Sequence, residues 1–371
     1  MPVLWGVVTM TVRHQHAAHK LVRRSAAVVL AAGTVLGAAG AATAAPAAPA
    51  HHRPHHQTSY KVDSAQLARG LYQSSYSERN HVLWATTAVG RPPVTQSQLL
   101  KVDPKSLKTK AAYTPPVTDA STKAVEAVYG VAVDDAHNTV WTTNTRNDSV
   151  AVYSQRTGKH LATVPGVKHA REIVVDERHN TAWASGFGDG SIVGFDTRTF
   201  KEKKRVTVKG AGTTGLAVNK WTGTVYATDL TNSNIIAVSR FSDQPKLIPT
   251  GQGPISIALS RDGRTAYTAD NKGGTLSVVD LLKGKVTRTV KTGEGALSVA
   301  ADPRSGNVFV ANRGPGNTTV VDPHKGAVVA TLATGPNPNH VTVARGTAFV
   351  VDKAAAGDKL LDSVHRISAE R

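Results

Sequence analysis

A period of about 42 residues runs through most of this chain, and it constrains the fold more than any other feature. Five apolar runs each end in a small polar residue, and these end residues lie 42, 43, 41 and 42 positions apart. They are Asp134, Asp176, Asn219, Ser260 and Asp302. A fixed period of this length indicates a repeat architecture, in which each unit buries its apolar surface against its neighbours.

An aromatic side chain follows each of these runs by about seven residues and marks the repeats a second time. With one more before and one after, there are seven such anchors: Trp84, Trp141, Trp183, Tyr226, Tyr267, Phe309 and Phe349. Each unit contains four short β-branched segments of alternating polarity, separated by turn signals such as Asp262-Gly263. Because this is typical of a propeller blade, the sequence predicts an all-β fold, a seven-bladed β-propeller of four-stranded blades.

The two ends of the repeat region predict how the ring of blades closes. The last unit supplies only three strands, around residues 341–343, 348–351 and 363–367. A further β-like stretch, beginning at residues 59–62, precedes the first unit. We expect this N-terminal strand to be the outer strand of the last blade, because the pairing would hide an open sheet edge.

The N-terminal residues have the pattern of an export signal. Four cations between residues 13 and 24 precede an Ala- and Gly-rich apolar run over residues 26–42, and Ala42-Thr43-Ala44 offers a small-residue cleavage site. We therefore predict a signal peptide over residues 1–44, cleaved near Ala44, and an exported protein that is extracellular or in the cell envelope. The run is short and weakly apolar for a membrane span, so no stable transmembrane anchor is expected.

The rest of the chain divides into a linker and one large domain. Residues 45–58 form an Ala/Pro/His-rich linker, which is either a solvated tether or a transient metal-binding segment. Residues 59–371 form the predicted propeller. The true start, Met1 or Met10, and the export route, Sec or twin-arginine, stay open.

Composition narrows the chemistry. Cysteine is absent, which excludes disulfides, thiolate metal sites and thiol nucleophiles. The formal net charge is +18, and removing residues 1–44 with their four cations lowers it to +14. A strongly basic surface favours anionic partners such as nucleic acid, acidic lipid headgroups or wall polyanions.

The repeat units resemble a known family. Trp141-Thr142-Thr143-Asn144 and Phe309-Val310-Ala311-Asn312 stand where the YVTN propeller repeats have their Tyr-Val-Thr-Asn signature. Residues 170–176 and 183–186 resemble most closely the YncE-like secreted propellers, and the resemblance covers residues 65–367. It implies a propeller fold and export rather than a particular activity. Insertions at residues 90–98 and 114–127 depart from the family pattern.

The predicted site lies on the loop face around the central channel, because loops carry function on such scaffolds. Its expected ligand-binding residues are polar or charged: Asn144, Arg146, His169, Arg171, Glu172, Lys272, Arg313, Asn339, His340 and Lys353. Arg171 and Glu172 are either an anion clamp or a blade-to-blade ion pair. His169 and His340 serve a metal or proton transfer only if both reach the axis. No catalytic residue, metal or cofactor is assigned.

Three functions are open at this point. Sequence motifs of hydrolases, zinc proteases and nucleotide-binding proteins are missing, so the first hypothesis is a non-catalytic binding or scaffolding module of the cell envelope. It would act as a monomer on an envelope protein, peptide or glycan. The alternative is binding of single-stranded DNA or another polyanion through the basic surface, with Tyr72 or Tyr76 stacking on bases rather than packing between blades. A hydrolase, lyase or oxidoreductase using the channel is a lesser alternative.

Overall fold

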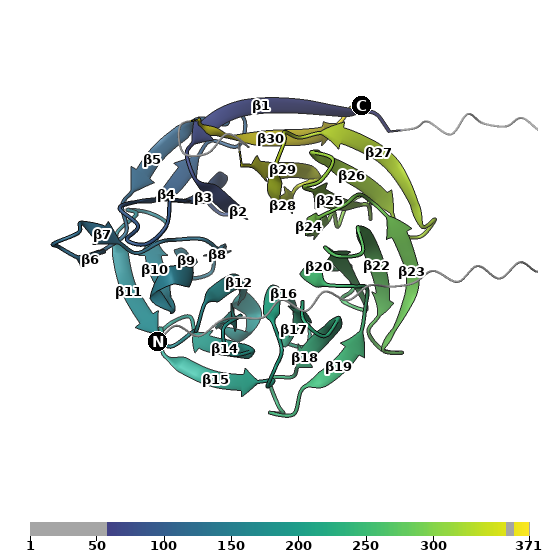
Figure 1. The fold of residues 1–371 in the computed structure, drawn as a ribbon, viewed down its shortest axis with the longest axis horizontal. Coiled ribbons are helices and arrows are strands. Elements are labelled where there is room, and N and C mark those ends of the chain that lie inside the picture. Colours follow the sequence, from purple (N-terminus) through teal and green to yellow (C-terminus); the bar gives the residue numbers. More distant parts are fainter. Residues whose placement is uncertain (1–57, 354–359, 371) are drawn as a thin grey trace, which may run out of the picture. The chain divides into compact units, whose positions relative to one another are not determined.

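Seven four-stranded antiparallel sheets stand in a ring around a central axis in the computed structural model (Figure 1). The structure describes residues 58–353 and 360–370, so the predicted signal peptide and all but the last residue of the linker lie outside the described residues. The predicted all-β, seven-bladed propeller is confirmed. Within the described ranges, no helix is long and apolar enough to cross a membrane.

Each blade runs from the axis outward. Blade 1 consists of β2 (Leu71–Ser77), β3 (Val82–Val89), β4 (Gln96–Val102) and β5 (Thr109–Tyr113). Blade 2 consists of β8 (Val131–Asp134), β9 (Thr139–Asn144), β10 (Ser149–Ser154) and β11 (His160–Pro165). Blade 3 consists of β12 (Ala170–Asp176), β13 (Thr181–Gly186), β14 (Ser191–Asp196) and β15 (Glu202–Thr207). Blade 4 consists of β16 (Thr213–Asn219), β17 (Thr224–Asp229), β18 (Asn234–Val238) and β19 (Lys246–Pro249).

The second half of the ring follows the same plan. Blade 5 consists of β20 (Pro254–Leu259), β21 (Thr265–Asp270), β22 (Thr275–Asp280) and β23 (Lys285–Lys291). Blade 6 consists of β24 (Ala296–Ala301), β25 (Val308–Asn312), β26 (Asn317–Asp322) and β27 (Ala327–Ala333). Blade 7 is β28 (Pro338–Ala344), β29 (Thr347–Asp352), β30 (Asp362–Ala369) and, outermost, β1 (Tyr60–Ala68). Two short 3₁₀ turns, η1 (Thr145–Asn147) and η2 (Glu177–His179), complete these elements.

The aromatic anchors explain the repeat. All seven lie on the second strands of their blades, and Trp84 and Trp141 are fully buried. Trp141 of blade 2 packs with Ile173 and Phe195 of blade 3, and Trp183 of blade 3 packs with Leu216 of blade 4. Each anchor thus fills the space between its own sheet and the next, which is the aligned face-to-face packing that a ring of twisted sheets requires.

The ring closes as predicted. β1 pairs antiparallel with β30 from Tyr60 opposite Ala369 to Ala68 opposite Asp362, so it extends well beyond the stretch predicted from sequence. Ser64 Oγ and His365 Nδ1 are hydrogen-bonded at 2.7 Å across this pair. Figure 1 shows β1 lying along β30, although they come from opposite ends of the chain. The N-terminal strand therefore removes the exposed edge of blade 7.

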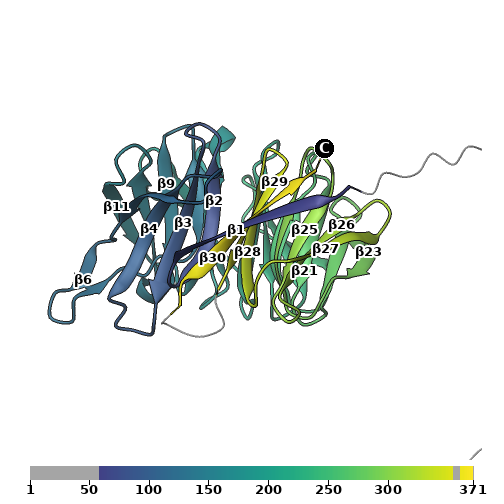
Figure 2. The same ribbon diagram turned by 90° about the horizontal axis from the view of Figure 1, so that it is seen from above.

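The insertions at residues 90–98 and 114–127 lie beside blades 1 and 2. The second contains the hairpin of β6 (Val117–Asp119) and β7 (Ala124–Val125), which projects away from the ring (Figures 1 and 2). Its base is fixed by the Val125 N–H, which donates to the Val94 carbonyl at 2.9 Å. The two insertions thus contact each other, and residues 96–98 of the first belong to β4 of blade 1.

Deleting residues 59–67 should open blade 7 and lower the melting temperature by about 10 °C or more, because β1 contributes apolar side chains to the clusters at both neighbouring blade interfaces. Differential scanning calorimetry of the full chain measures this. Deleting residues 45–53, a segment of the same length in the linker, is the control. Equal melting curves for the two deletions would contradict closure by β1.

Candidate functional site

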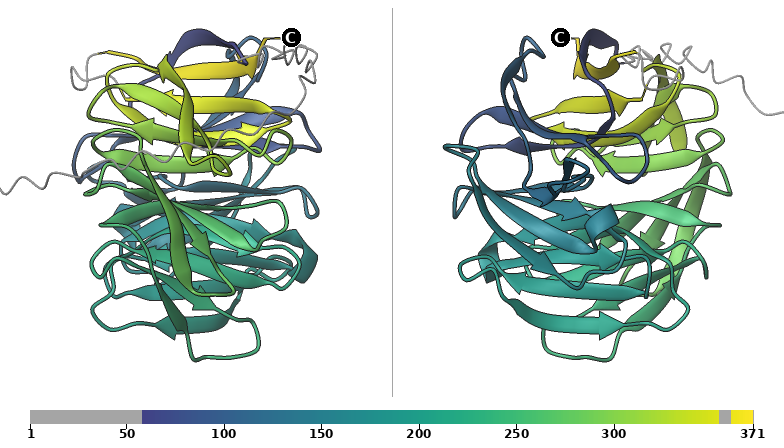
Figure 3. Two further views of the ribbon diagram at one scale, coloured as in Figure 1. Left: turned by 90° about the vertical axis from the view of Figure 1, so that its right-hand side faces the viewer. Right: turned by 60° about the vertical axis from the view of Figure 1, so that its left-hand side comes forward.

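The blades present two different faces. Strands alternate in direction within each sheet, so loops that join second to third strands and loops that join blades lie on one face, the cup face. Turns that join first to second and third to fourth strands lie on the other, the turn face. Figure 3 shows the strands running between the two. The cup face contains a central cavity of about 320 Å³, called here the cup.

The floor of the cup is built from one equivalent position in six of the seven blades, and Gly130, at this position in blade 2, is not among the lining residues. This position lies four residues before the end of each inner apolar run: Gln73, Gly130, Glu172, Gly215, Ser256, Ser298 and His340. In most blades the pairing register of the first strand shifts near this residue, as between Pro338 and His340 of β28. We call these seven positions the waist ring.

Side chains of the waist ring connect neighbouring blades. Ser298 Oγ accepts from the Val341 backbone N–H at 3.0 Å, and Ser256 Oγ accepts from Val299 N–H at 3.2 Å. His340 Nδ1 accepts from Ser74 N–H at 3.3 Å, across the junction where the ring closes. Each bond satisfies a backbone donor next to a register shift, so the lining of the cup also stabilises the ring.

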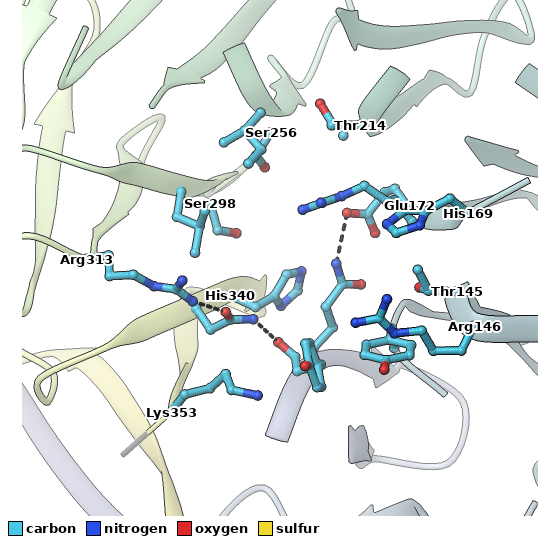
Figure 4. A pocket seen from close by; sticks show the side chains of 18 residues that line it. Thr145, Arg146, His169, Glu172, Thr214, Ser256, Ser298, Arg313, His340 and Lys353 are labelled. Carbon is cyan, nitrogen blue, oxygen red and sulfur yellow. Dashed lines mark hydrogen bonds between the residues drawn. The ribbon is translucent and has the colours of Figure 1, made fainter. Parts of the chain in front are cut away.

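Two glycines create the exceptions. A Cβ at Gly130 would lie 2.6 Å from the Arg171 carbonyl oxygen, and one at Gly215 would lie 2.6 Å from the Ser256 Cα. Because Gly130 has no side chain, blade 1 reaches blade 3 directly, and Gln73 Nε2 donates to Glu172 Oε2 at 3.0 Å (Figure 4).

Cations surround the upper part of the cup. Arg146, Arg171, Arg313 and Lys353 line it together with His169, whereas Glu172 is the single carboxylate among its described lining residues. Within the part of the chain that the structure describes, the three arginines form no salt bridge. The cup is therefore an electropositive cavity.

Neutral groups contact three of these cations. Lys353 Nζ lies 3.6 Å from the Tyr72 ring centroid, and the Arg171 guanidinium lies 5.8 Å from that of Phe187. Arg313 donates to Asn339, whose Nδ2 donates to the Tyr72 carbonyl at 2.6 Å. These contacts fix the positions of Arg171 and Arg313 and place Lys353 beside the Tyr72 ring.

Burial shifts the titration of the groups at the floor. It raises the pKa of Glu172 to about 7, against the opposing effects of the Gln73 hydrogen bond and the Arg171 charge. It lowers the pKa of His340 to about 4, so this imidazole is neutral at pH 7. Since His340 Nδ1 accepts from a backbone N–H, its proton is on Nε2. Desolvation, followed by the charges of Arg171 and Arg146, lowers the pKa of His169.

Eight of the ten residues predicted from sequence line the cup: Arg146, His169, Arg171, Glu172, Arg313, Asn339, His340 and Lys353. Asn144 does not, because it is buried and donates to Glu126 Oε2 at 2.8 Å and to Ser149 Oγ at 3.2 Å. Lys272 lies against Gly253 and is not among the lining residues. Ligand binding by these residues stays a prediction.

The alternatives left open for single residues are now distinguishable. The blade-to-blade bond of Glu172 goes to Gln73, and the described residues show no ion pair of Glu172 with Arg171. Tyr76 stacks on Phe349 with centroids 6.3 Å apart, which is blade packing, whereas Tyr72 lines the cup. No group of three or more metal-binding side chains occurs in residues 58–353 and 360–370.

Sequence reasoning missed several lining residues: Tyr72, Gln73, Tyr129, Thr145, Thr214, Ser256 and Ser298. Three of these, and the glycines at the same position, follow from the fixed offset of four residues before the end of each inner run. This offset is visible in the sequence, but finding it requires an alignment of the blades position by position, whereas a search for charged loops misses it.

Two proteins of known sequence are similar to this chain over more than half of its length. The uncharacterized protein YncE of Salmonella typhi is 26% identical over 236 residues, which is 59% of this chain and 64% of that protein. YncE of Escherichia coli K12 is 26% identical over 240 residues, 60% of this chain and 65% of that protein. The chain is a seven-bladed β-propeller that is similar in sequence to YncE. It spans just under two thirds of the length of these YncE proteins, and no family model matches it.

Solved propellers show the same fold at low identity. A catalytically inactive virginiamycin B lyase from Staphylococcus aureus with quinupristin has a TM-score of 0.69 at 12% identity, over 84% of this chain and 99% of that one. Kuenenia stuttgartiensis hydrazine synthase has a TM-score of 0.64 at 14% identity, over 77% and 93%. Because these identities are so low, the likeness to these enzymes shows a shared fold alone.

Replacing Glu172 by Gln should stabilise the protein at high pH. The raised pKa means that the folded state holds a proton which the unfolded chain loses near 4.5, so wild-type stability falls as pH rises from about 4.5 to about 7. The variant lacks this loss and should exceed the wild type by about 1–2 kcal/mol at pH 8–9, but not near pH 4.5. Urea unfolding at both pH values tests it. An equal difference at the two would show that Glu172 does not titrate as described.

Proposed function

We propose that this propeller is an exported, non-catalytic binding module of the cell envelope whose ligand places an anionic group in the cup. The observation that carries the proposal is the set of cations in the cup, of which Arg171 and Arg313 are held by neutral partners. The N-terminal signal pattern over residues 1–44 supports export. The expected ligand is the carboxylate or phosphate end of an envelope peptide, protein or glycan.

The energetics favour an anion at this place. Desolvation lowers the pKa of Arg171 and Arg313, yet an arginine that starts from 12.5 stays charged at neutral pH. Arg171 and Arg313 lose hydration and form no salt bridge among the described residues, and the charges of Glu172 and Asp352 only partly offset the effect of burial on their pKa values. An entering carboxylate or phosphate would replace the lost hydration of these guanidinium groups through charge-assisted, bidentate hydrogen bonds.

The shape and lining of the cup restrict the ligand. A cavity of about 320 Å³ is at the small end of ligand sites, so it takes a terminal group rather than a long chain. Tyr72 and Tyr129, whose ring centroids are 4.4 Å apart, supply an aromatic wall for an apolar part of the ligand. His340 Nε2–H and the hydroxyls of Ser256 and Ser298 offer neutral donors at the floor.

A catalytic role has less support. The YncE relatives are uncharacterized, and the lyase and synthase neighbours share the fold alone. Glu172, the one carboxylate of the described lining, already accepts a hydrogen bond from Gln73. A hydrolase, lyase or oxidoreductase acting in the channel is therefore the lesser alternative.

Binding of single-stranded DNA or another polyanion is the second candidate, favoured by the formal net charge of +18. The two candidates differ in how affinity depends on salt. A strand that contacts Z phosphates gives a slope of about −0.7Z in a plot of log affinity against log salt. One anionic group in the cup gives a shallow slope, of about −1 or smaller in magnitude.

Isothermal titration of the full chain with inorganic phosphate, citrate and free-carboxylate peptides tests the proposal, with C-terminally amidated peptides as matched ligands. Arg313→Gln should weaken binding of the ligands that bind by about tenfold or more, because a charge-assisted hydrogen bond is lost. Lys209→Gln, which removes an exposed cation outside the cup, should leave affinity unchanged.

Three results would overturn the proposal: no binding of any of these anions, equal binding of amidated and free peptides, or equal affinity for the wild type and Arg313→Gln. A steep salt dependence with oligo-dT and none of these ligands bound would favour the polyanion candidate instead.

A further inference from the structure

Three large apolar side chains protrude from the turn face, on the side of the propeller opposite the cup. Trp221 lies in the β16–β17 turn and is 55% exposed, and Phe241 lies in the β18–β19 turn and is 79% exposed. Leu282 lies in the β22–β23 turn and is 86% exposed. All three turns belong to adjacent blades 4 and 5, so these side chains are on one sector of one face.

Cations accompany the aromatic rings in this sector. Arg178 and Lys220 lie 5.6 and 5.0 Å from the Trp221 ring centroid, and Arg240 lies 4.3 Å from that of Phe241. Two neighbouring hollows that share Asp176 join the aromatic residues across blades 3 and 4. We call Arg178, Lys220, Trp221, Arg240, Phe241 and Leu282 the turn patch.

Acidic groups near the turn patch are already engaged. Glu177 Oε1 accepts from the Asp135 backbone N–H at 2.6 Å, and Asp243 forms a salt bridge with Lys204 at 2.9 Å. Asp176 is buried and bonded to His179 at 2.7 Å. Of these acids only Glu177 is exposed without a paired cation among the described residues, so the patch's three cations, Arg178, Lys220 and Arg240, outnumber it.

We propose that the turn patch docks the propeller onto an anionic lipid bilayer. Tryptophan and phenylalanine side chains partition to the headgroup level of a membrane, a leucine tip adds apolar area below it, and neighbouring lysines and arginines bind acidic headgroups. Protruding apolar tips ringed by cations match this layered surface in both hydrophobicity and charge. Since the cup opens on the opposite face, docking leaves it accessible.

The same residues suit nucleic acid less well. Binding of a single strand needs free aromatic faces on which bases stack. At Trp221 two cations already lie over the ring, and the most exposed member of the patch, Leu282, has no ring at all. Nucleic-acid binding is therefore an outcome of the test below and not the expectation.

Trp221 provides a local probe. Among the described tryptophans, Trp84, Trp141 and Trp183 are buried. In the full chain carrying Trp5→Phe, quenching of tryptophan fluorescence by brominated lipid should therefore report on Trp221. We expect quenching with vesicles of phosphatidylglycerol and phosphatidylcholine, little with phosphatidylcholine alone, and a loss of the effect at about 0.5 M salt.

Cosedimentation with the same vesicles tests the patch by paired variants in the full chain. Two double variants change the patch: one removes apolar side chains (Phe241→Ala with Leu282→Ser), and the other removes cations (Arg178→Gln with Lys220→Gln). Each should lower the bound fraction by about tenfold. Two control pairs remove exposed groups elsewhere on the surface: Leu161→Ser with Val328→Ser, and Lys209→Gln with Lys291→Gln. Each should change the bound fraction by less than about twofold. Residues 1–57 are identical in all four, so their own lipid affinity cancels.

The proposal fails if the patch pairs and the control pairs behave alike while all retain the wild-type melting temperature. It also fails if Trp221 is not quenched by brominated lipid. Quenching of Trp221 by oligo-dT without vesicle binding would assign the turn patch to nucleic acid instead.

Discussion

The antiparallel pairing of β1 with β30 joins two segments about 300 residues apart in the chain, as the Ser64–His365 hydrogen bond between residues 301 positions apart illustrates. Such long-range pairing is slow to form, because a long stretch of chain must be closed before the contacts are made. In return it removes the exposed edge of blade 7 and holds blade 7 against blade 1. Asp362 at the start of β30 accepts from the Leu71 backbone N–H at 2.8 Å, so the closing sheet also fixes the first inner strand.

The cup depends on this closure. Gln73 and His340 come from blades 1 and 7, on either side of the junction, and His340 Nδ1 accepts from Ser74 N–H across it. Lys353 reaches the Tyr72 ring over the same junction. An open ring would separate these groups, and the electropositive cavity with its neutral histidine would not exist. Fold and candidate site are therefore one problem in this propeller, since the bonds that line the cavity also hold the blades together.

Much of the fold follows from the sequence because repeats and anchors are local signals. The spacing of Trp84 to Phe349 predicts seven blades, and the missing fourth strand of the last unit predicts closure. The site is less predictable because direction is not local. The sequence predicts that Asn144 faces the channel, yet it is the last residue of β9 and its amide donates to Glu126, which lies in an insertion outside the repeat pattern. Ser298 has no charge or motif that marks it in the sequence, and its role follows only from its position on the inner strand, where its hydroxyl accepts from the Val341 N–H of the next blade.

The propeller thus carries two positive surfaces with different physics: a recessed cavity where cations are partly desolvated, and an exposed patch where cations surround apolar side chains. The central claim concerns the cavity. Anomalous diffraction from crystals grown in sodium bromide tests it most directly, because bromide reports where a bare anion settles. The account predicts a bromide peak inside the cup, in contact with Arg171 and Arg313. Bromide peaks confined to the outer surface, with none in the cup, would contradict it.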